Sequence, residues 1–476
     1  MPADLADRSF DLAVIGGGPG GYTAAIRASQ LGMRTVLVER EHLGGVCLNW
    51  GCIPTKALLR SAQLFRDMQD VAAHGFDLAG PVSVDMARLV GRSRAIAGQL
   101  SAGVRYLMKK NRITVIEGTA RLGGALGDGR HEVHVQRAAG PMTLVAKRVI
   151  LATGARARTL PGLAASPARL WTYKEAITPE ALPRSLLVIG SGAIGIELGC
   201  FYRALGAEVT VVEMMERILP AEDDEISAVA QAAFERQGLR FFVGTRVEAV
   251  EDAGSGVKAT LRTASGERLQ VSAERVIQAI GIRGNVENLG LERTKVRVEG
   301  THVLTGSFNE TDEPGIHAIG DLAGAPWLAH KASHEAVACV EHIAGVPGVA
   351  PLEPGRVPGC TYSSPQVASV GLTEAQAKAQ GRAVKVGRHR FAANGKALAL
   401  GEPEGLVKMV FDAQSGELLG AHMVGAEVTE LIHSIAMART MEATEAELMH
   451  TVFPHPTLSE AILESTLDAW ERAIHH

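Results

Sequence analysis

The feature of this sequence that most constrains its fold is a unit that occurs twice. Each unit begins with a short apolar run, continues with Gly-x-Gly-x-x-Gly and an amphipathic helical stretch, and ends with a second apolar run closed by an acid. The glycines and acids are Gly16, Gly18, Gly21 and Glu39 in the first unit and Gly190, Gly192, Gly195 and Glu213 in the second. The acid follows the first glycine by 23 residues in both units. One such glycine turn is common, but its repetition in the same context predicts two dinucleotide-binding βαβ units.

Each position of the repeated pattern has a physical role. The first glycine makes the tight turn, the second lets the backbone approach a pyrophosphate, and the third lets the helix pack closely on the strand. The pyrophosphate would lie on the exposed N–H groups at the helix start, and the acid would bind a ribose diol. The carboxylate of Glu213 would repel a 2′-phosphate, which favours NAD over NADP, although Arg217 lies nearby in the sequence.

Composition excludes several classes of protein. The chain has 476 residues, 46% hydrophobic and 21% charged, which is typical of a globular protein of about three domains. The net charge of −4 gives no electrostatic reason to expect a nucleic acid or an anionic membrane as partner. No apolar stretch approaches the ~18 residues that span a bilayer, and the N-terminus lacks the apolar core of a signal peptide. Five cysteines are too few for a disulfide framework, so we expect a cytoplasmic protein.

Two cysteines, Cys47 and Cys52, lie in a glycine-rich segment after the first unit. Gly51 and Pro54 flank Cys52, and because proline suits the first turn of a helix, we expect Cys52 near a helix N-terminus. A helix dipole lowers the pKa of a thiol there, and such a thiol beside a second one is what reversible disulfide exchange needs. The other three cysteines are scattered and form no second pair, so we expect no metal site.

The segment Gly44-Gly-Val-Cys-Leu-Asn-Trp-Gly-Cys-Ile-Pro-Thr-Lys56 resembles the redox-active segment of the pyridine nucleotide–disulfide oxidoreductases, a family of FAD flavoproteins. The resemblance covers essentially the whole chain. Ala152-Thr-Gly154 and Ala279-Ile-Gly281 are similar to the family's crossings between its flavin and NAD domains. Ala318-Ile-Gly-Asp321 resembles the flavin-binding strand, and His455-Pro-Thr-Leu-Ser-Glu460 resembles the catalytic segment of the C-terminal domain. The resemblance implies FAD and NAD as cofactors.

The same resemblance implies an α/β fold with two Rossmann-like dinucleotide-binding domains, for FAD and NAD, and a C-terminal α+β dimerisation domain. The expected parts are 1–150 for the FAD domain, 151–275 for the NAD domain, 276–345 for a central segment that completes the FAD-binding region, and 346–476 for the dimerisation domain. It also implies a homodimer in which His455 of one subunit completes the site around Cys47 of the other.

Roles for the reactive residues follow from the resemblance. It implies that Cys47 and Cys52 form the redox-active disulfide, with Cys47 meeting the substrate and Cys52 the flavin. His455 would be the catalytic base and Glu460 the acid that orients it. Thr457-Leu-Ser-Glu460 is also a capping box, however, so Glu460 taken alone could equally serve only to cap a helix.

Further residues are assigned to the cofactors by the same resemblance. Lys56, one helical turn after Cys52, would lie near the reactive edge of the flavin. Glu197 would pair with Lys56, unless it is only an exposed acid favoured by the helix dipole. Asp321 would reach the ribityl or pyrophosphate region. The other expected contacts are Ala120 at the FAD adenine, Ala329 at the flavin pyrimidine side, Val247 at the NAD adenine and Gly281 at the return crossing.

Within the family, the chain resembles the branch that oxidises dihydrolipoyl groups with NAD⁺, on Trp327–Glu335, Glu213 and Phe391–Ala397. The implied partner is a lipoyl-bearing acyltransferase (E2) of a 2-oxo acid dehydrogenase complex or the H protein of the glycine cleavage system. A reductase of glutathione disulfide or of mercuric ion, and a flavoprotein kept as a structural subunit, are the alternatives. Two features depart from the family pattern: Trp50 replaces a smaller aliphatic residue, and Ile282–Asn285 lacks an expected proline.

Overall fold

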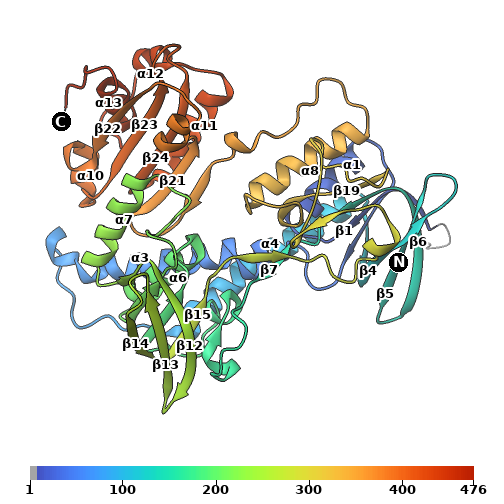
Figure 1. Cartoon of the computed structure of the whole chain (residues 1–476), viewed down its shortest axis with the longest axis horizontal. Coiled ribbons are helices and arrows are strands. Elements are labelled where there is room, and N and C mark those ends of the chain that lie inside the picture. The colour runs from blue at the N-terminus through green and yellow to red at the C-terminus, as the bar shows by residue number, and fades with distance from the viewer. Residues whose placement is uncertain (1–7, 476) are drawn as a thin grey trace. The chain divides into compact units, whose positions relative to one another are not determined.

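The structure is a computed structural model that describes residues 8–475 (Figure 1). Residues 1–7 and His476, with which the predicted first and last domains begin and end, lie outside the described residues. By its internal contacts the chain divides into two units. The first contains the chain up to Ala57, Gly91–Ala157 and Ile282–Pro354, and the second contains Leu58–Val90, Arg158–Gly281 and the chain from Gly355 onward. The second unit includes Leu58–Val90, which the sequence assigned to the FAD domain.

The first unit is built on a seven-stranded sheet in the order β3-β2-β1-β6-β5-β4, with β19 also paired to β6. Its strands are β1 Ser9–Ile15, β2 Thr35–Glu39, β3 Thr114–Glu117, β4 Thr119–Ala125, β5 His131–Arg137, β6 Gly140–Leu151, β7 Ala155–Ala157, β16 Ile282–Gly284, β17 Val298–Glu299, β18 His302–Val303 and β19 Ile316–Ala318. Its helical elements are α1 Pro19–Gln30, α2 Gly45–Trp50, the start of α3 Cys52–Gln69, most of α4 Met86–Lys110, α8 Ala329–Ile343 and the short 3₁₀ helices η3 Leu291–Arg293 and η4 Gly320–Ala323.

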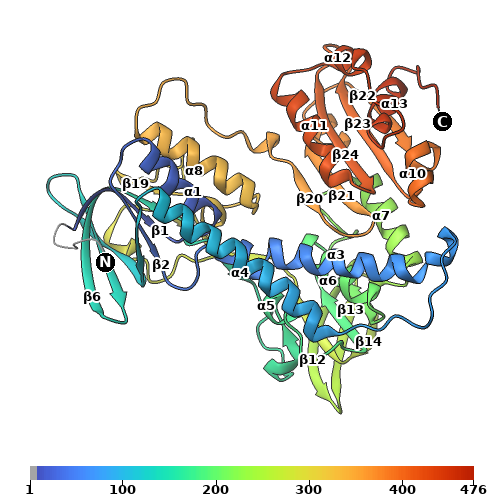
Figure 2. The same ribbon diagram turned by 180° about the vertical axis from the view of Figure 1, so that it is seen from behind.

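Strand β1 is apolar on both of its faces, so each face of the sheet must pack against other elements. Successive side chains of a strand point to opposite faces. Leu12 and Val14 therefore pack in one core with Ala25 of α1, whereas Ala13 and Ile15 pack in a second core on the other face. In both views α1 and α8 lie side by side, and they pack against each other (Figures 1 and 2). A continuous apolar strand of this kind is typical of a parallel α/β sheet.

The second unit contains a five-stranded sheet in the order β11-β10-β9-β15-β8 and a three-stranded sheet β12-β13-β14. Its strands in this part are β8 Leu170–Trp171, β9 Ser185–Ile189, β10 Glu208–Val212, β11 Arg240–Phe242, β12 Thr245–Ala253, β13 Gly256–Thr263, β14 Arg268–Ala273 and β15 Arg275–Gln278. Its helices here are α5 Tyr173–Ala176, α6 Ala193–Ala204 and α7 Asp224–Arg236, with 3₁₀ helices η1 Val71–His74 and η2 Pro167–Arg169.

The same parallel register occurs in both glycine-containing units. Ile15 of β1 lies opposite Val38 of β2, and Ile189 of β9 lies opposite Val212 of β10. The next residue after each partner is the acid, Glu39 or Glu213. The carboxyl ends of both strand pairs are therefore aligned, which places each acid beside its glycine turn.

The C-terminal part of the second unit is an antiparallel sheet in the order β20-β21-β24-β23-β22, as expected for the α+β domain. All eight residues of β24 are buried, and Leu418, Ala421 and Met423 pack in a core shared with α11 and α13. Figure 2 shows α11 beside this sheet. The elements are β20 Gly359–Thr361, β21 Gln366–Gly371, β22 Val384–Arg390, β23 Leu406–Asp412, β24 Leu418–Gly425, α9 Glu374–Ala379, α10 Gly395–Leu400, α11 Val428–Thr440, α12 Glu445–His450 and α13 Glu460–Asp468, with η5 Pro354–Arg356 and η6 Phe391–Ala393. Within residues 8–475, no helix is both long and apolar enough to cross a membrane.

Candidate active site

The first glycine turn leads from β1 into α1 with Gly18 as the N-cap residue. Gly16 has a φ of 107°, and a Cβ there would lie 2.3 Å from the carbonyl oxygen of Ala152. At Gly18, in contrast, the nearest atom to an added Cβ is 3.9 Å away, so the backbone is open to an approaching group. Glu39 accepts a hydrogen bond from the N–H of Gly17 at 2.7 Å, which ties the acid to the turn. This construction fits a pyrophosphate at the helix start with an acid beside it.

The second turn, from β9 into α6, repeats the first closely. Gly190 has a φ of 98°, and a Cβ there would lie 2.4 Å from a backbone oxygen, whereas a Cβ at Gly192 would meet nothing within 4 Å. One carboxylate oxygen of Glu213 accepts from the N–H and the hydroxyl of Ser191, at 2.8 and 2.7 Å. The other accepts from the N–H of Met215 at 2.9 Å. The second turn therefore fits a second dinucleotide.

Arg217, which left the choice between NAD and NADP open, is engaged elsewhere in the structure. Its Nη2 lies 3.0 Å from a carboxylate oxygen of Asp224 and donates to the carbonyl oxygen of Pro220 at 3.3 Å. A guanidinium bound in this way is less available to a 2′-phosphate. The charged side chain bound to this turn is therefore the carboxylate of Glu213. A carboxylate binds a ribose with a free diol and repels a 2′-phosphate.

The two cysteines lie in contact beside the first turn. Cys47 lies in α2 and Cys52 is the first residue of α3, as expected for a cysteine at a helix N-terminus. Both are free cysteines in this structure. The hydrogen bond with the Cys52 thiol, and then burial, raise the pKa of Cys47 far above its usual range, and the Lys56 cation offsets part of this.

Tyr22 of α1 is a neighbour of this pair that sequence reasoning missed. Burial, and then the charges of Cys47 and Cys52, raise the pKa of the Tyr22 phenol. The phenol therefore stays protonated at neutral pH beside the thiols. Tyr22 directly follows the third glycine of the turn in the sequence, which is a signal that could have indicated it.

Asp321 lies in η4, shortly after β19, and this turn is bound by Lys331 and Glu335, to which the sequence analysis assigned no role of their own. The ammonium of Lys331 donates to the carbonyl oxygens of Gly320 and Gly324, at 3.1 and 2.9 Å, and lies 2.9 Å from Glu335. The other carboxylate oxygen of Glu335 accepts from the N–H of Gly320 at 2.8 Å. Burial raises the pKa of Asp321, and the Lys331 cation opposes this shift. The spacing of four residues between Lys331 and Glu335 on one helix was the available signal.

The His455 and Glu460 side chains form the predicted pair. Nδ1 of His455 is hydrogen-bonded to one carboxylate oxygen of Glu460 at 2.9 Å, and the other oxygen accepts from the N–H of Thr457 at 2.8 Å. Burial would raise the pKa of Glu460, but the hydrogen bonds from Thr457 and His455 lower it below its usual value. The carboxylate thus orients the imidazole. The N-cap residue of α13 is Ser459, without a side-chain cap, so the capping box expected from Thr457 to Glu460 does not form and the bond to Thr457 fixes the loop before the helix.

Glu197 is not an exposed acid at a helix start. It is 5% exposed on α6 and accepts a hydrogen bond from the N–H of Tyr362 at 2.9 Å. That alternative is therefore wrong, because the helix packs in the interior rather than facing solvent. Its pairing with Lys56 stays a prediction.

The remaining expected residues lie in these elements as follows. Ala120 is buried in β4, Ala329 is the first residue of α8, and Val247 lies in β12 where its pairing with β13 shifts. Gly281 has a φ of 100°, and a Cβ added there would meet nothing within 4 Å. Of the predicted residues, the first unit contains Gly16, Gly18, Gly21, Glu39, Cys47, Cys52, Lys56, Ala120, Asp321 and Ala329, and the second contains Gly190, Gly192, Gly195, Glu197, Glu213, Val247, Gly281, His455 and Glu460.

The segment that lacks the expected proline is fixed by hydrogen bonds instead. The Thr153 hydroxyl donates to the carbonyl oxygen of Asn285, and the Asn285 amide donates to the carbonyl oxygen of Thr153, both at 2.9 Å. Arg156 donates to the side-chain oxygen of Asn285 at 2.7 Å. This departure from the family pattern therefore leaves the crossing at Thr153 well defined.

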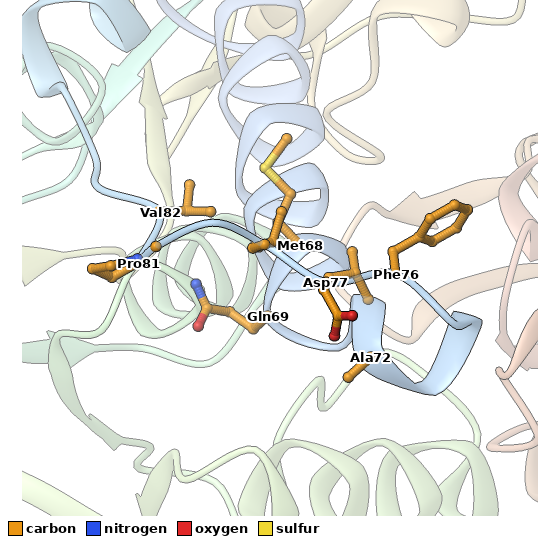
Figure 3. Close-up of a pocket in the computed structure, with 10 residues that line it drawn as sticks. Met68, Gln69, Ala72, Phe76, Asp77, Pro81 and Val82 are labelled. Carbon is orange, nitrogen blue, oxygen red and sulfur yellow. The ribbon is translucent and has the colours of Figure 1, made fainter.

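Two further observations concern metal ligands and cavities. Among the described residues, no group of three or more His, Cys, Asp or Glu side chains is placed to hold a metal ion. A pocket of about 230 Å³ after α3, shown in Figure 3, contains none of the predicted site residues. It is lined by Met68, Gln69, Val71, Ala72, Phe76, Asp77, Leu78, Gly80, Pro81 and Val82.

Comparison with known proteins agrees with this geometry. Residues 10–336 match the family model for pyridine nucleotide-disulphide oxidoreductases, and residues 357–466 match the dimerisation domain of the same family. The chain belongs to the pyridine nucleotide-disulphide oxidoreductases. It is an oxidoreductase with the predicted α/β fold, FAD and NAD are the cofactors of its class, and its dimerisation domain supports a homodimer.

Individual relatives cover almost the whole chain. The dihydrolipoyl dehydrogenase of Rhizobium etli is 53% identical over 98% of this chain and 99% of its own length, and that of Bacillus subtilis is 43% identical over 98% and 99%. Among solved structures, LpdA from Mycobacterium tuberculosis superposes with a TM-score of 0.87 at 29% identity, covering 96% of this chain and 98% of its own.

Proposed function

We propose that this chain oxidises dihydrolipoyl groups to lipoyl groups with NAD⁺, through FAD and the Cys47–Cys52 couple. The observation that carries the proposal is the pair of thiols in hydrogen-bond contact next to the first glycine turn. The 53% identity to the dihydrolipoyl dehydrogenase of Rhizobium etli supports the choice of substrate. FAD, when bound, supplies an acceptor for two electrons and passes them to NAD⁺.

The exchange step uses the cysteines alone. In the oxidised enzyme a thiolate of the dihydrolipoyl group attacks Sγ of Cys47, the Cys47–Cys52 bond breaks, and Cys52 leaves as a thiolate. The second substrate sulfur then attacks the first, which closes the lipoyl disulfide and releases Cys47. Two electrons have passed from the substrate to the cysteine pair. Cys47 is released as a thiolate, and because its pKa is raised beside Cys52 it takes up a proton, such as the one that the base removed from the substrate thiol.

His455 removes the proton that the substrate thiol must lose before it attacks. Its Nδ1 is bound to Glu460, so Nε2 is the ring nitrogen that exchanges the proton. We propose that His455 acts on the Cys47 of a second copy of the chain, as the dimerisation domain of the family suggests. A monomer would then be inactive.

The cofactor sites follow the two glycine turns. FAD would be held by Gly16, Gly18, Gly21, Glu39, Lys56, Ala120, Asp321 and Ala329, and NAD by Gly190, Gly192, Gly195, Glu197, Glu213, Val247 and Gly281. We further propose a lipoyl-bearing acyltransferase (E2) or a glycine cleavage H protein as partner, in the cytoplasm.

Turnover assays with purified protein test the proposal. We expect oxidation of dihydrolipoamide with NAD⁺, little with NADP⁺, and none in Cys52→Ser, whereas Cys360→Ser, outside the couple, keeps the wild-type rate. Turnover of glutathione disulfide or mercuric ion in place of lipoamide would assign another branch of the family. A protein that binds FAD but turns over none of these substrates would point to the structural subunit.

A further inference from the structure

Helix α4 supplies hydrogen bonds to the segment that carries the two cysteines. Four of its side chains donate to this segment: Arg92 to Ala57 O at 3.0 Å, Ser93 to Pro54 O at 3.0 Å, Arg94 to Asn49 O, and Ser101 to Asn49 Oδ1 at 2.9 Å. All of these residues belong to the first unit. Ser93, Ser101 and Asn49 are buried, so water does not compete for their bonds.

Asn49 is the residue on which these bonds converge. Its amide donates to the carbonyl oxygens of Leu43 and Gly45, at 3.1 and 2.9 Å, which closes α2 onto the loop before it. Ser101 and Arg94 then bind its side-chain and main-chain oxygens from α4. Ser101 follows Arg94 by seven residues, about two helical turns, so both side chains lie on one face of α4.

Arg94 also contacts Trp50, the aromatic residue that departs from the family pattern. Its guanidinium carbon lies 4.5 Å from the centroid of the Trp50 ring, within the range of a cation–π contact. Burial lowers the pKa of Arg94, as expected for a cation withdrawn from water between a carbonyl and a ring. Asn49 and Trp50 both stand between Cys47 and Cys52 in the sequence, so Arg94 binds the link between the two sulfurs.

We propose that Arg94 is a positioning residue for the Cys47–Cys52 couple, acting through the Asn49 carbonyl and the Trp50 ring. A disulfide fixes this link covalently, but once it opens, the link keeps its shape only through non-covalent contacts. Arg94 therefore holds the two thiols close enough to close again. This inference rests on the proposed role of the two cysteines as a redox couple.

The dithiol–disulfide equilibrium of the holoenzyme in glutathione buffers tests the proposal, with thiols counted by alkylation and mass spectrometry. Arg94→Met should lower the equilibrium constant for closing the disulfide by about 5–30-fold, as for loss of a charge-assisted hydrogen bond and a cation–π contact. For a two-electron couple this raises the reduction potential by about 20–45 mV. The equilibrium constant of Arg94→Lys should lie between those of the wild type and of Arg94→Met, because an ammonium keeps the charge but not the planar fork of the guanidinium. Trp50→Leu should shift the constant less than Arg94→Met does.

Arg88→Met is the matched control, because Arg88 lies on the same helix with its side chain 90% exposed. It should leave the equilibrium constant unchanged. A wild-type constant in Arg94→Met, even with a lower unfolding temperature, would overturn the proposal and leave Arg94 a purely structural residue. If Arg94→Met does not fold, wild-type constants in both Arg94→Lys and Trp50→Leu would overturn it. Failure of the wild-type protein to form the disulfide at all would instead contradict the proposed function.

Discussion

The buried pair Lys331–Glu335 gives the sharpest stability prediction, because every proton of one ammonium has a defined acceptor. Lys331, 5% exposed, meets Glu335 and the carbonyl oxygens of Gly320 and Gly324 within 3.1 Å. Lys331→Met would leave the buried Glu335 without its counter-ion and two carbonyl groups without this donor. Breaking a buried ion pair in this way costs about 3–5 kcal/mol.

The loss should also reach the cofactor, because η4 carries Asp321. The Lys331 cation favours the ionised form of Asp321, so Lys331→Met should raise the pKa of Asp321 further and loosen the turn that carries it. We therefore expect the variant to unfold at a lower urea concentration than wild type and to release FAD earlier in the titration. Circular dichroism measures the unfolding and flavin fluorescence measures the release of FAD, and both are recorded on the same samples.

Lys378 of α9 provides the matched control. It pairs with Glu374 at the same spacing of four residues and a distance of 2.6 Å, but its side chain is 59% exposed. Because exposed pairs contribute only about 0–1 kcal/mol, Lys378→Met should leave the unfolding midpoint almost unchanged. Equal effects of Lys331→Met and Lys378→Met would refute the reasoning, since burial would then make no difference.

Three further predictions concern the base, the nicotinamide site and pH. His455→Gln should lower kcat for dihydrolipoamide by about 10²–10⁴-fold, as for loss of a general base, while reduction of an artificial acceptor by NADH, which does not pass through the cysteine couple, proceeds normally. Glu213→Gln should raise the KM for NAD⁺ about tenfold or more in steady-state assays, without NADP⁺ becoming the better substrate, because Arg217 stays bound to Asp224. Burial lowers the pKa of His317 to about 4, so the unfolded chain binds its proton first, and stability should fall as pH drops from about 6.5 to about 4. This residue can change the free energy of unfolding by at most about 1.4 kcal/mol per pH unit. Urea unfolding at a series of pH values measures this dependence, and the same dependence in His317→Leu as in the wild type would contradict the assignment.

The parts of the molecule that could be predicted from the sequence are those with short-range signals. The two glycine turns, the acids that close them and the helix start at Cys52 each depend on residues within one βαβ unit or one turn. The sequence did not settle whether Arg217 reaches a 2′-phosphate, because that depends on where Asp224 lies after folding. It also presented helix capping and orientation of His455 as alternatives for Glu460. In the structure one carboxylate oxygen binds His455 and the other binds the N–H of Thr457, in the loop before the N-cap residue Ser459, because the position of the helix start is set by folding of the whole loop.

Arg94 and Lys331, which bind the short helices α2 and η4, were not predicted from the sequence, and the physical reason is the same for both. Terminal carbonyl groups of a short helix have no intrahelical partner, and a cation from a longer helix can bind them. Arg94 of α4 does this at Asn49 of α2, and Lys331 of α8 does it at η4. Because the acceptors are main-chain atoms, the sequence of the turn carries no sign of its partner, which in the case of Asn49 lies 45 residues away. We therefore expect substitutions at Arg94 of α4, outside the motifs, and at Lys331 of α8, to which no role was assigned, to alter the redox couple and the flavin site as strongly as many substitutions within the motifs.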